Sequence, residues 1–289
     1  MGRVNCVYTY DDLLSDVKRL KKLGADVCNI GKTVAGREIP SVHIGNYTGM
    51  QVLIQGAIHG REHITAQLIT QQIYYTIENY GELHGGIYFI PMSNPDGVSL
   101  CQFGLDSVKD IKMRDFLLRV NGGADFSLWK ANLNAVDLNC NFPARWGKGV
   151  MNVRRPTPES YIGDSPASEP EVKALMEFTL RTRPHLTISY HCKGEEIYWQ
   201  FGQKGKRFIR DKAYAAEFSR ITGYNIIGGD RGSAGGYKDW CIQRLKIPAF
   251  TFEAVPDSYQ HPVDYAALDG EFQRNKDIPK TALDLLNGE

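Results

Sequence analysis

The apolar residues at the start of the chain are spaced for one face of a helix. Thr9 followed by Asp12 matches a capping box, and Gly24 follows a basic last turn. The apolar positions between them are Leu13, Leu14, Val17, Leu20 and Leu23. This pattern predicts an amphipathic first helix between Thr9 and Gly24.

Shorter patterns divide the rest of the chain into strands and helices. Strand patterns occupy residues 39–45, 51–57, 86–92, 185–191 and 249–253, and helical patterns occupy residues 62–80, 168–182 and 213–223. The helix at 62–80 separates two of the strands, which predicts that the strands at 51–57 and 86–92 form a parallel pair joined by a crossover. This alternation places the chain in the α/β class.

A long stretch between Asn94 and Pro170 shows little periodicity and is rich in Asn, Gly, Pro and Arg. In a compact domain such a stretch is usually a functional loop. We expect it, with residues 254–267, to frame a binding cleft. Because no repeat, low-complexity tract or clear boundary divides the chain, residues 1–289 are predicted to form a single domain.

Composition narrows the possible functions. With 289 residues, 42% of them hydrophobic, the chain can bury a large core. Thirty-four basic and 33 acidic residues give a net charge of +1 without a run of like charge, which argues against nucleic acid or an anionic membrane as a partner. The first residues lack the apolar core of a signal peptide, and no window is apolar enough to insert into a membrane. We therefore expect a cytoplasmic protein as the sequence is written, or a secreted one if a leader has been removed.

A cluster of titratable residues follows the strand at 51–57. His59 and Glu62 lie three positions apart where a strand gives way to a helix, at the edge where open α/β sheets bind ligands. One imidazole and one carboxylate would make two of the three protein ligands of a catalytic zinc site. A solvated helix start would show the same spacing, so a third ligand from another strand end is needed. His63 is expected on the surface of the helix.

Two other strands end in residues of the required types. His191 closes the strand at 185–191, and Glu253 closes the strand at 249–253. His191 can supply the third ligand, since the remaining histidines fit a strand end less well, and Glu253 can be the general base that takes a proton from the attacking water. A hydrogen-bonded core histidine and an exposed strand end are the simpler alternatives at these two positions.

Five motifs in order along the chain resemble the zinc carboxypeptidase family of metallopeptidases. They are HGREHIT (59–65), VDLNCNF (136–142), SYHCKGEEIYW (189–199), GGYKDW (235–240) and AFTFE (249–253). The likeness covers nearly the whole chain, beginning with YTYDDLL at 8–14. It implies an α/β fold with a central mixed, mostly parallel β-sheet flanked by helices on both faces.

The resemblance also implies the catalytic roles. His59, Glu62 and His191 would bind one zinc ion, and Glu253 would be the general base that later gives its proton to the leaving amine. Asp137 would orient a histidine ligand, and its loss would weaken metal binding about tenfold or more.

Three further positions would act on the substrate. Lys130 stands where digestive members of the family polarise the scissile carbonyl with an arginine, so it would supply a positive charge without the planar guanidinium group. An ordinary surface lysine is the simpler alternative. Arg61 and Asn139 would contact carboxylate and carbonyl groups of the substrate.

Some positions depart from the digestive members. Their D-x-N-R-N pattern uses its arginine to clamp a terminal carboxylate, and Cys140 stands there in this chain. Counting back from Glu253, Arg231 falls near the position of a mobile tyrosine and Lys238 near the specificity pocket. These two cations suggest an acidic group on the substrate, and with Arg61 they would replace the missing clamp.

Four segments, WKAN, SEPE, SYHCKGEEIYW and GGYKDW, are more similar to the bacterial branch that cleaves between γ-D-glutamate and a diamino acid such as meso-diaminopimelate in cell-wall peptides. We therefore expect a zinc peptidase with a peptide or muropeptide substrate. The alternatives are a general metallocarboxypeptidase, a related zinc amidoacylase, a non-catalytic zinc protein that binds muropeptides, and a purely structural α/β domain. Cys140 argues against the first of these, and Glu253 argues against a non-catalytic protein.

Overall fold

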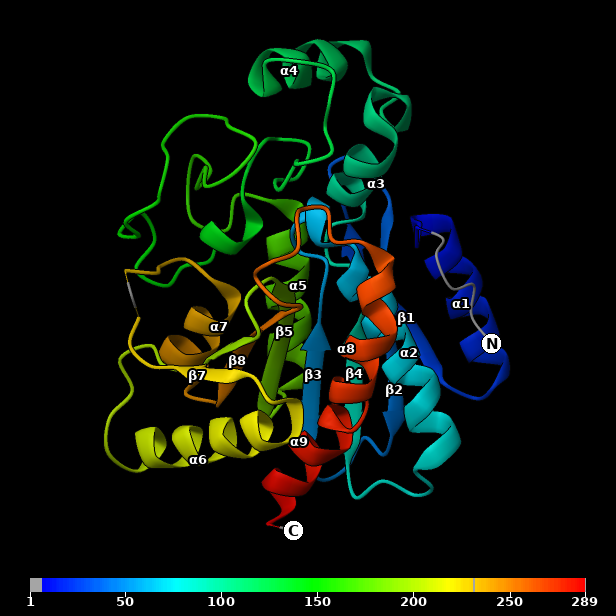
Figure 1. Cartoon of the computed structure of the whole chain (residues 1–289), viewed down its shortest axis with the longest axis vertical. Coiled ribbons are helices and arrows are strands. Elements are labelled where there is room, and N and C mark those ends of the chain that lie inside the picture. Colours follow the sequence, from blue (N-terminus) through cyan, green and yellow to red (C-terminus); the bar gives the residue numbers. More distant parts are fainter. Residues whose placement is uncertain (1–6, 231, 289) are drawn as a thin grey trace.

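A computed structural model describes residues 7–230 and 232–288, and in this part of the chain eight strands form one mixed sheet (Figure 1). The strand order is β1-β2-β4-β3-β5-β8-β6-β7. The strands are β1 (Asp26–Lys32), β2 (Glu38–Gly45), β3 (Gln51–Gln55), β4 (Gly86–Ile90), β5 (Leu186–Cys192), β6 (Glu196–Tyr198), β7 (Asn225–Ile227) and β8 (Ala249–Ala254). Four neighbouring pairs are parallel, namely β3 with β4, β3 with β5, β5 with β8, and β6 with β7. The expected single α/β fold with a mixed, mostly parallel sheet is confirmed.

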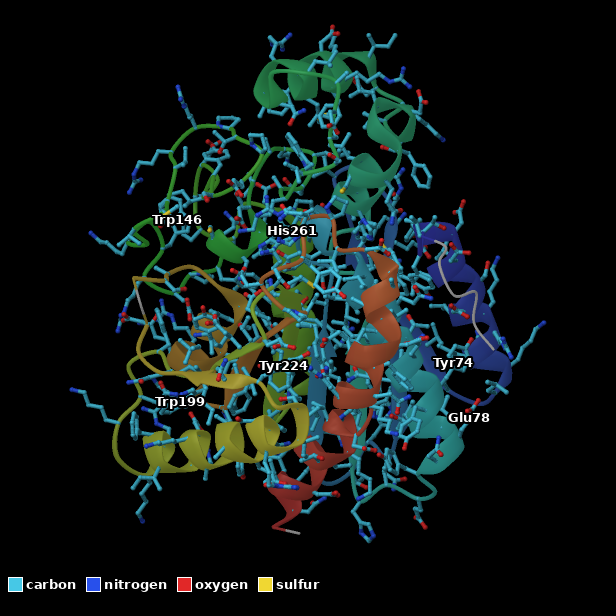
Figure 2. The ribbon with its side chains drawn as sticks, viewed as in Figure 1. Tyr74, Glu78, Trp146, Trp199, Tyr224 and His261 are labelled. Atoms are coloured by element: carbon cyan, nitrogen blue, oxygen red, sulfur yellow. The ribbon has the colours of Figure 1, made fainter. Side chains whose placement is uncertain are left out.

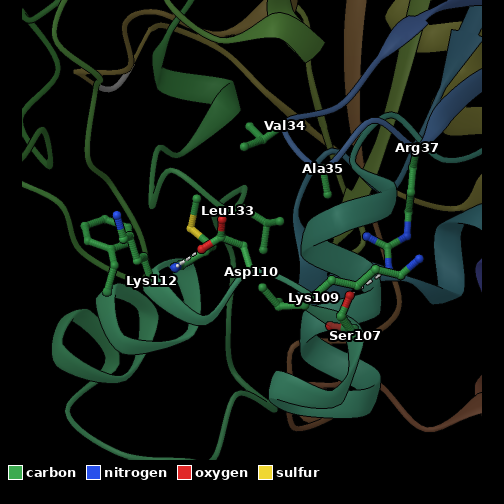
Figure 3. A pocket seen from close by; sticks show the side chains of 11 residues that line it. Val34, Ala35, Arg37, Ser107, Lys109, Asp110, Lys112 and Leu133 are labelled. Carbon is green, nitrogen blue, oxygen red and sulfur yellow. Dashed lines mark hydrogen bonds between the residues drawn. The ribbon is translucent and has the colours of Figure 1, made fainter.

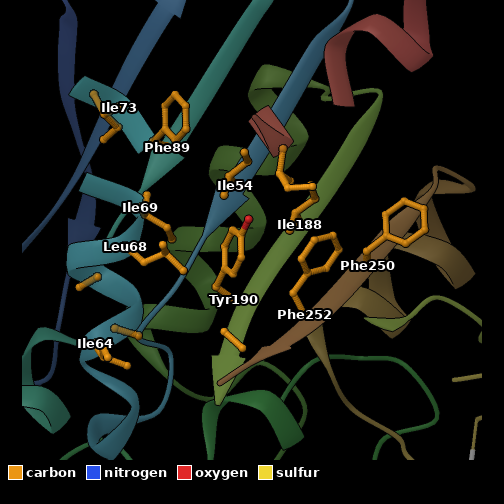
Figure 4. Packing of buried hydrophobic residues seen from close by; sticks show 14 of the residues in the cluster. Ile54, Ile64, Leu68, Ile69, Ile73, Phe89, Ile188, Tyr190, Phe250 and Phe252 are labelled. Carbon is orange, nitrogen blue, oxygen red and sulfur yellow. The ribbon is translucent and has the colours of Figure 1, made fainter. Parts of the chain in front are cut away.

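Helices cover both faces of the sheet, as predicted. One face carries α1 (Tyr10–Lys22), α2 (Ile64–Asn79), α6 (Gly205–Thr222), α8 (Leu268–Asn275) and α9 (Ile278–Asn287), and the other carries α5 (Pro170–Thr182) and α7 (Tyr237–Trp240). Successive strand residues alternate between the two cores, because Val52 and Ile54 pack on the first face and Leu53 on the second. Figure 4 shows Ile64, Leu68, Ile69 and Ile73 of α2 beside buried side chains of β3, β4, β5 and β8.

Local signals at the N-terminal half of the chain are also confirmed. The Thr9 side chain accepts a hydrogen bond from the Asp12 backbone N–H at 3.1 Å, and the Thr9 backbone N–H donates to the Asp12 carboxylate at 3.0 Å, which completes the capping box of α1. Strands β3 and β4, which precede and follow α2 in the sequence, pair in parallel as predicted. The central strands β3, β4 and β5 are buried along their whole length, which explains their continuous apolar sequences.

The region between Asn94 and Pro170 contains more helix than we expected from its sequence. It forms α3 (Pro95–Phe103), α4 (Ile111–Asn121) and single turns at Gly104–Ser107 (η2) and Leu138–Cys140 (η3), so the expectation of loop throughout is wrong for its first half. Residues Pro95–Cys101 of α3 are all buried, whereas only Leu117 of α4 is buried. α3, whose residues are nearly all buried, shows no half-apolar period, whereas Met113, Phe116, Leu117 and Val120 of α4 recur at helical spacing and pack in one apolar cluster, a signal that sequence reasoning missed.

The remaining short elements are η1 (Gly60–Glu62), the π-helical turn η4 (Cys241–Leu245) and η5 (Tyr265–Ala267). Within the described residues, no helix combines the length and the apolar character that crossing a bilayer requires.

Candidate metal centre and catalytic cleft

The predicted site residues gather at one edge of the sheet, beyond the carboxyl ends of three neighbouring strands. His59 and Glu62 follow β3, whereas His191 and Glu253 face each other in register near the ends of β5 and β8. In open α/β sheets this edge is where ligands bind. The strand topology therefore brings together four residues that are up to 194 positions apart in the sequence.

Two imidazoles and one carboxylate converge on a point at this edge. Glu62 places Oε1 2.8 Å from His59 Nδ1 and Oε2 3.0 Å from His191 Nδ1. The two Nδ1 atoms are 3.2 Å apart, and one ligand atom from each of the three residues lies within 4.8 Å of the others. All three side chains are buried.

The hydrogen bonds around this group fit a bound cation. His59 Nε2 lies 3.1 Å from Asp137 Oδ1, so an N–H donated to that carboxylate leaves Nδ1 with a lone pair. This lone pair points at the Glu62 carboxylate, and such a contact is favourable only with a positive charge between the two atoms. His191 Nε2 is buried without a hydrogen-bond partner among the described residues, so Nδ1, which faces Glu62, is the nitrogen of that ring placed to bind the cation. A pair of histidines and one carboxylate is a ligand set of catalytic zinc, so the residues present fit this metal.

Charges beside the metal ligands fix the protonation of the neighbouring residues. Burial would raise the pKa of Asp137, but the Lys130 ammonium, 2.9 Å from Oδ2, and His59 hold that pKa well below its usual range. Burial would likewise lower the pKa of Lys130, but Asp137 and Glu62 raise it above its ordinary value. Lys130 is therefore a permanent cation at the metal centre, and its alternative as an ordinary surface lysine is wrong.

Glu253 is poised differently from the other carboxylates of the site. Part of its side chain opens into the cleft, yet the surrounding protein raises its pKa to about 7. Burial is the main cause, with His191 opposing the rise and Glu62 adding to it. A carboxylate with a pKa near neutrality can both take and return a proton at physiological pH.

A cleft of about 450 Å³ opens beside this centre. Its walls include Lys130, Asp137, Asn139, Lys238 and Glu253, so five of the predicted site residues face one space. Arg61 instead lines an adjacent pocket, where its guanidinium is 3.1 Å from the Glu159 carboxylate. Glu159 borders both spaces, which makes the two pockets neighbours.

The substrate-facing residues differ in how free they are. Asn139 Oδ1 accepts a hydrogen bond from the Tyr237 backbone N–H at 3.1 Å, so part of its amide is already used. Lys238 Nζ lies 2.5 Å from Asp239 Oδ1, and this cation is therefore paired rather than free as its sequence position suggested. Arg231, the second predicted cation, lies outside the described residues.

Cys140 leaves the position of the family's clamping arginine without charge. Its side chain borders the cleft, and burial together with nearby Asp137 raises the pKa of its thiol well above the usual range. The thiol stays protonated at neutral pH, so it offers no cation to a terminal carboxylate.

The metal-ligand segment and the opposite wall of the cleft touch at Gly60. Its backbone N–H donates to the Lys130 carbonyl at 3.0 Å. A Cβ atom at Gly60 would come within 2.5 Å of the Gly97 carbonyl oxygen and 2.8 Å of the Trp129 carbonyl oxygen. Only glycine permits this approach, which joins His59 and Lys130 through one backbone contact.

Sequence reasoning missed or misplaced two histidines near the centre. His63 was expected on the helix surface, but it is buried and its Nδ1 lies 2.7 Å from the Tyr265 hydroxyl. His261 extends from the loop after β8 over the strand ends (Figure 2), where burial lowers its pKa and Glu62 raises it. The partner of His63 and His261 itself both lie in the distant segment 254–267, so the sequence around His63 carries no periodic signal of its burial.

Another cavity opens beside the turn that follows β1 (Figure 3). It measures about 650 Å³ and is bordered by the turn at Val34–Arg37, by residues 107–116 and by Leu133. None of the predicted site residues borders it.

Comparison with known proteins places these features in a family. The chain matches the family model described as zinc carboxypeptidase over residues 10–287. It is 31% identical over 282 residues to gamma-D-glutamyl-L-diamino acid endopeptidase 1 of Lysinibacillus sphaericus, which covers 92% of this chain and 69% of that protein. It is 32% identical over 272 residues to the uncharacterised protein YqgT of Bacillus subtilis (strain 168), covering 84% of this chain and 69% of that one.

Solved structures share the fold at lower identity. Bovine thrombin-activatable fibrinolysis inhibitor, in complex with tick carboxypeptidase inhibitor, superposes with a TM-score of 0.80 at 18% identity over 98% of this chain and 99% of that one. The murein-tripeptide amidase MpaA of Escherichia coli O157 gives a TM-score of 0.56 at 19% identity over 89% and 91% of the two chains. At these identities the likeness shows the fold alone.

Proposed function

The chain belongs to the zinc carboxypeptidase family and is a zinc metallopeptidase, and from this premise we propose that it cleaves bacterial cell-wall peptides at the amide bond between γ-D-glutamate and meso-diaminopimelate. One observation carries the proposal. Glu253 and Lys130 line a cleft beside the metal ligands, and in this cleft an uncharged Cys140 replaces the clamp for a plain terminal carboxylate.

One zinc ion, held by His59, Glu62 and His191, would supply a Lewis acid for the scissile carbonyl and an activated water. Residues of the chain transfer the proton and stabilise the developing negative charge. Glu253, whose pKa burial raises, takes the proton of the attacking water and passes it to the leaving amine. The Lys130 ammonium stabilises the negative charge that develops on the carbonyl oxygen.

Asp137 serves both sides of this reaction. One carboxylate oxygen faces His59 Nε2 at 3.1 Å and the other faces Lys130 Nζ at 2.9 Å. The same carboxylate therefore fixes the orientation of a metal ligand and holds the cation at the carbonyl.

The charged side chains that the cleft lacks and contains indicate which substrate it selects. Without a clamping arginine, a terminal α-carboxylate gains little from Cys140. Lys238 lines the cleft, is 8% exposed and is paired with Asp239. Its ammonium can also attract a second carboxylate on the leaving residue. Diaminopimelate carries such a carboxylate on its side chain, and lysine does not. The similarity to an endopeptidase named for a γ-D-glutamyl-L-diamino acid bond supports this choice.

The test is cleavage of L-Ala-γ-D-Glu-meso-diaminopimelate by the zinc-loaded protein, followed by mass spectrometry. The matched substrate carries lysine in place of diaminopimelate, and the matched protein is Glu253→Ala. We expect release of diaminopimelate by the native protein alone, and slower release of lysine. Faster turnover of ordinary C-terminal dipeptides would show a general metallocarboxypeptidase, and no cleavage with zinc bound would overturn the proposed substrate in favour of a binding protein or another amide.

A further inference from the structure

The SEPE segment at 168–171 has no part in the chemistry described above, yet its two carboxylates are buried. Glu169 is 4% exposed and Glu171 is 2% exposed. Burying two acidic groups so near each other is costly unless hydrogen bonds compensate. Their partners therefore indicate what the segment does.

Both carboxylates bind the same amide. Asn132 Nδ2 donates to Glu169 Oε2 at 2.7 Å and to Glu171 Oε2 at 3.1 Å. Asn134 Nδ2 donates to Glu169 Oε2 as well, at 2.8 Å. The start of α5 thus holds one short turn of the long loop region from two sides.

Asn132 organises that turn from within. Its Oδ1 accepts the backbone N–H groups of Asn134 and Val136, each at 3.1 Å, and its own N–H donates to the Val136 carbonyl at 3.0 Å. All the hydrogen-bonding capacity of the Asn132 amide is thereby used. The turn it closes, residues 132–136, lies between Lys130 and Asp137.

Apolar packing and hydrogen bonds both hold this turn, because Leu133 and Ala135 are buried in one apolar cluster with Trp129. On its outer side, Leu133 borders a cavity of about 650 Å³, and so does Val34 (Figure 3). The Val34 backbone N–H donates to Glu171 Oε1 at 3.2 Å. Apolar contacts tolerate small shifts of the side chains that make them, whereas a hydrogen bond fixes the distance and direction between two groups. The hydrogen bonds to α5, which packs against the sheet, therefore set the position of the turn.

We propose that Glu169 and Glu171, acting through Asn132, are positioning residues of the active site. They hold the 132–136 turn so that the Lys130 ammonium and the Asp137 carboxylate meet each other and His59. Neither glutamate touches the reacting atoms. The effect on turnover rests on the proposed function, whereas the effect on metal affinity rests only on the contact between Asp137 and His59.

The experiment replaces the hydrogen-bond donor of Asn132, which contacts both glutamates, with an acceptor. Asn132→Asp places a third carboxylate against Glu169 and Glu171, and Asn132→Asp combined with Glu169→Gln restores a donor–acceptor pair. The matched control is Glu177→Gln, an exposed position on the same helix. Zinc affinity is measured by competition with a chromophoric chelator, and kcat and KM are measured on the muropeptide.

We expect Asn132→Asp to weaken zinc binding and to lower kcat by about tenfold each, with KM little changed, because neighbours of a metal ligand typically tune affinity by this amount. The double variant recovers most of both losses, and Glu177→Gln changes neither. A purely structural role would lower the melting temperature of Asn132→Asp without moving zinc affinity in the folded protein, and this result would overturn the proposal.

Two further readouts keep the test decisive. If Asn132→Asp does not fold, Glu169→Ala replaces it, since this change removes an acceptor without adding charge, and unchanged zinc affinity in folded Glu169→Ala counts against the proposal. If no variant, including the native protein, cleaves the muropeptide, the zinc affinities still decide the positioning role while the proposed substrate fails separately.

Discussion

Two walls surround the site, and they are held in place in part by different forces. The strand wall comprises His59, Glu62, His191 and Glu253, and the loop wall comprises Lys130, Asp137, Asn139 and Cys140. Behind the strand wall lie fully buried apolar residues such as Ile188, Tyr190 and Phe252, and β5 and β8 fix the register of His191 and Glu253.

The loop wall also contains buried apolar residues, among them Trp129, Leu133 and Leu138, but individual polar contacts position its site residues. The Lys130 N–H donates to the Pro158 carbonyl at 3.2 Å, the Asp137 N–H donates to the Tyr161 carbonyl at 2.8 Å, and Asn132 closes the turn between them. Apolar packing tolerates swaps of similar volume, whereas a polar network fails when one partner changes type. The comparison teaches that the strand wall can accept apolar exchanges behind it, whereas the loop wall is sensitive to the exchange of a single polar partner such as Asn132.

Removing the metal breaks the strand wall most completely. A strong chelator is expected to abolish peptide hydrolysis and to lower the melting temperature, because the ion binds only the folded protein. Re-addition of zinc should restore both. Calorimetry and the cleavage assay check this, and full activity after verified loss of the metal would contradict the assignment of His59, Glu62 and His191.

Glu253→Gln removes the base while keeping the strand wall intact. We expect kcat to fall about 10²- to 10⁴-fold, as for other general bases, because the amide cannot accept the proton of water. Zinc affinity and the unfolding midpoint should hold, since burial already disfavours the charged form of this side chain. A variant that keeps near-native kcat would assign the base elsewhere.

Lys130→Met tests the loop wall at its charge. Loss of the cation should lower kcat about 10²- to 10³-fold, as for other groups that stabilise an oxyanion. Asp137 would also lose its counter-ion, so the variant should unfold at a lower temperature. Lys130→Arg is the control and should retain part of the activity, and equal losses in both variants would point to shape rather than charge.

Glu171→Gln tests how Glu171, which contacts the loop wall through Asn132, changes the unfolding free energy with pH. Burial raises the pKa of Glu171 to about 7, so the folded state favours the protonated form. Its contribution to stability is complete below the ordinary pKa of about 4.5 and is lost as the pH rises through about 7. From about pH 4.5 to 8 the native protein should lose about 2–3 kcal/mol of unfolding free energy relative to Glu171→Gln. Urea unfolding at several pH values measures this, and parallel pH profiles for the two proteins would refute it.

Lys238→Met should give the smallest effect, because this cation is already paired with Asp239. The preference for diaminopimelate over lysine in otherwise identical peptides should fall about tenfold, the equivalent of one modest ion pair. Ratios of kcat/KM for the two peptides provide the measurement. An unchanged ratio would move the recognition of the second carboxylate to Arg231 or Arg61.

The strand wall could be predicted from the sequence, and the loop wall only in part. An apolar run that ends in a histidine or glutamate marks a strand end, and parallel strands bring such ends to one edge. Lys130, Asp137 and Asn139 came from resemblance to a family instead. The structure then placed them in one cleft with Glu253.

Sequence patterns could not predict contacts between polar residues that are far apart in the chain. Asn132 and Glu169 are 37 positions apart, and their hydrogen bond leaves no period in either segment. The buried position of His63 was missed for the same reason, because its partner Tyr265 is 202 positions away. The three-residue strands β6 and β7 are too short to show alternation.

The close contact at Gly60 limits how this protein can diverge. The Gly60 N–H meets the Lys130 carbonyl across a gap too narrow for a side chain, so the loop must present the same carbonyl in the same register whatever its other residues are. Insertions and deletions are then tolerated at the tips of the loop region but not on either side of Trp129 and Lys130. New substrate preferences would have to arise by exchanging side chains along the cleft or by lengthening the distal loops, with this one joint inherited unchanged.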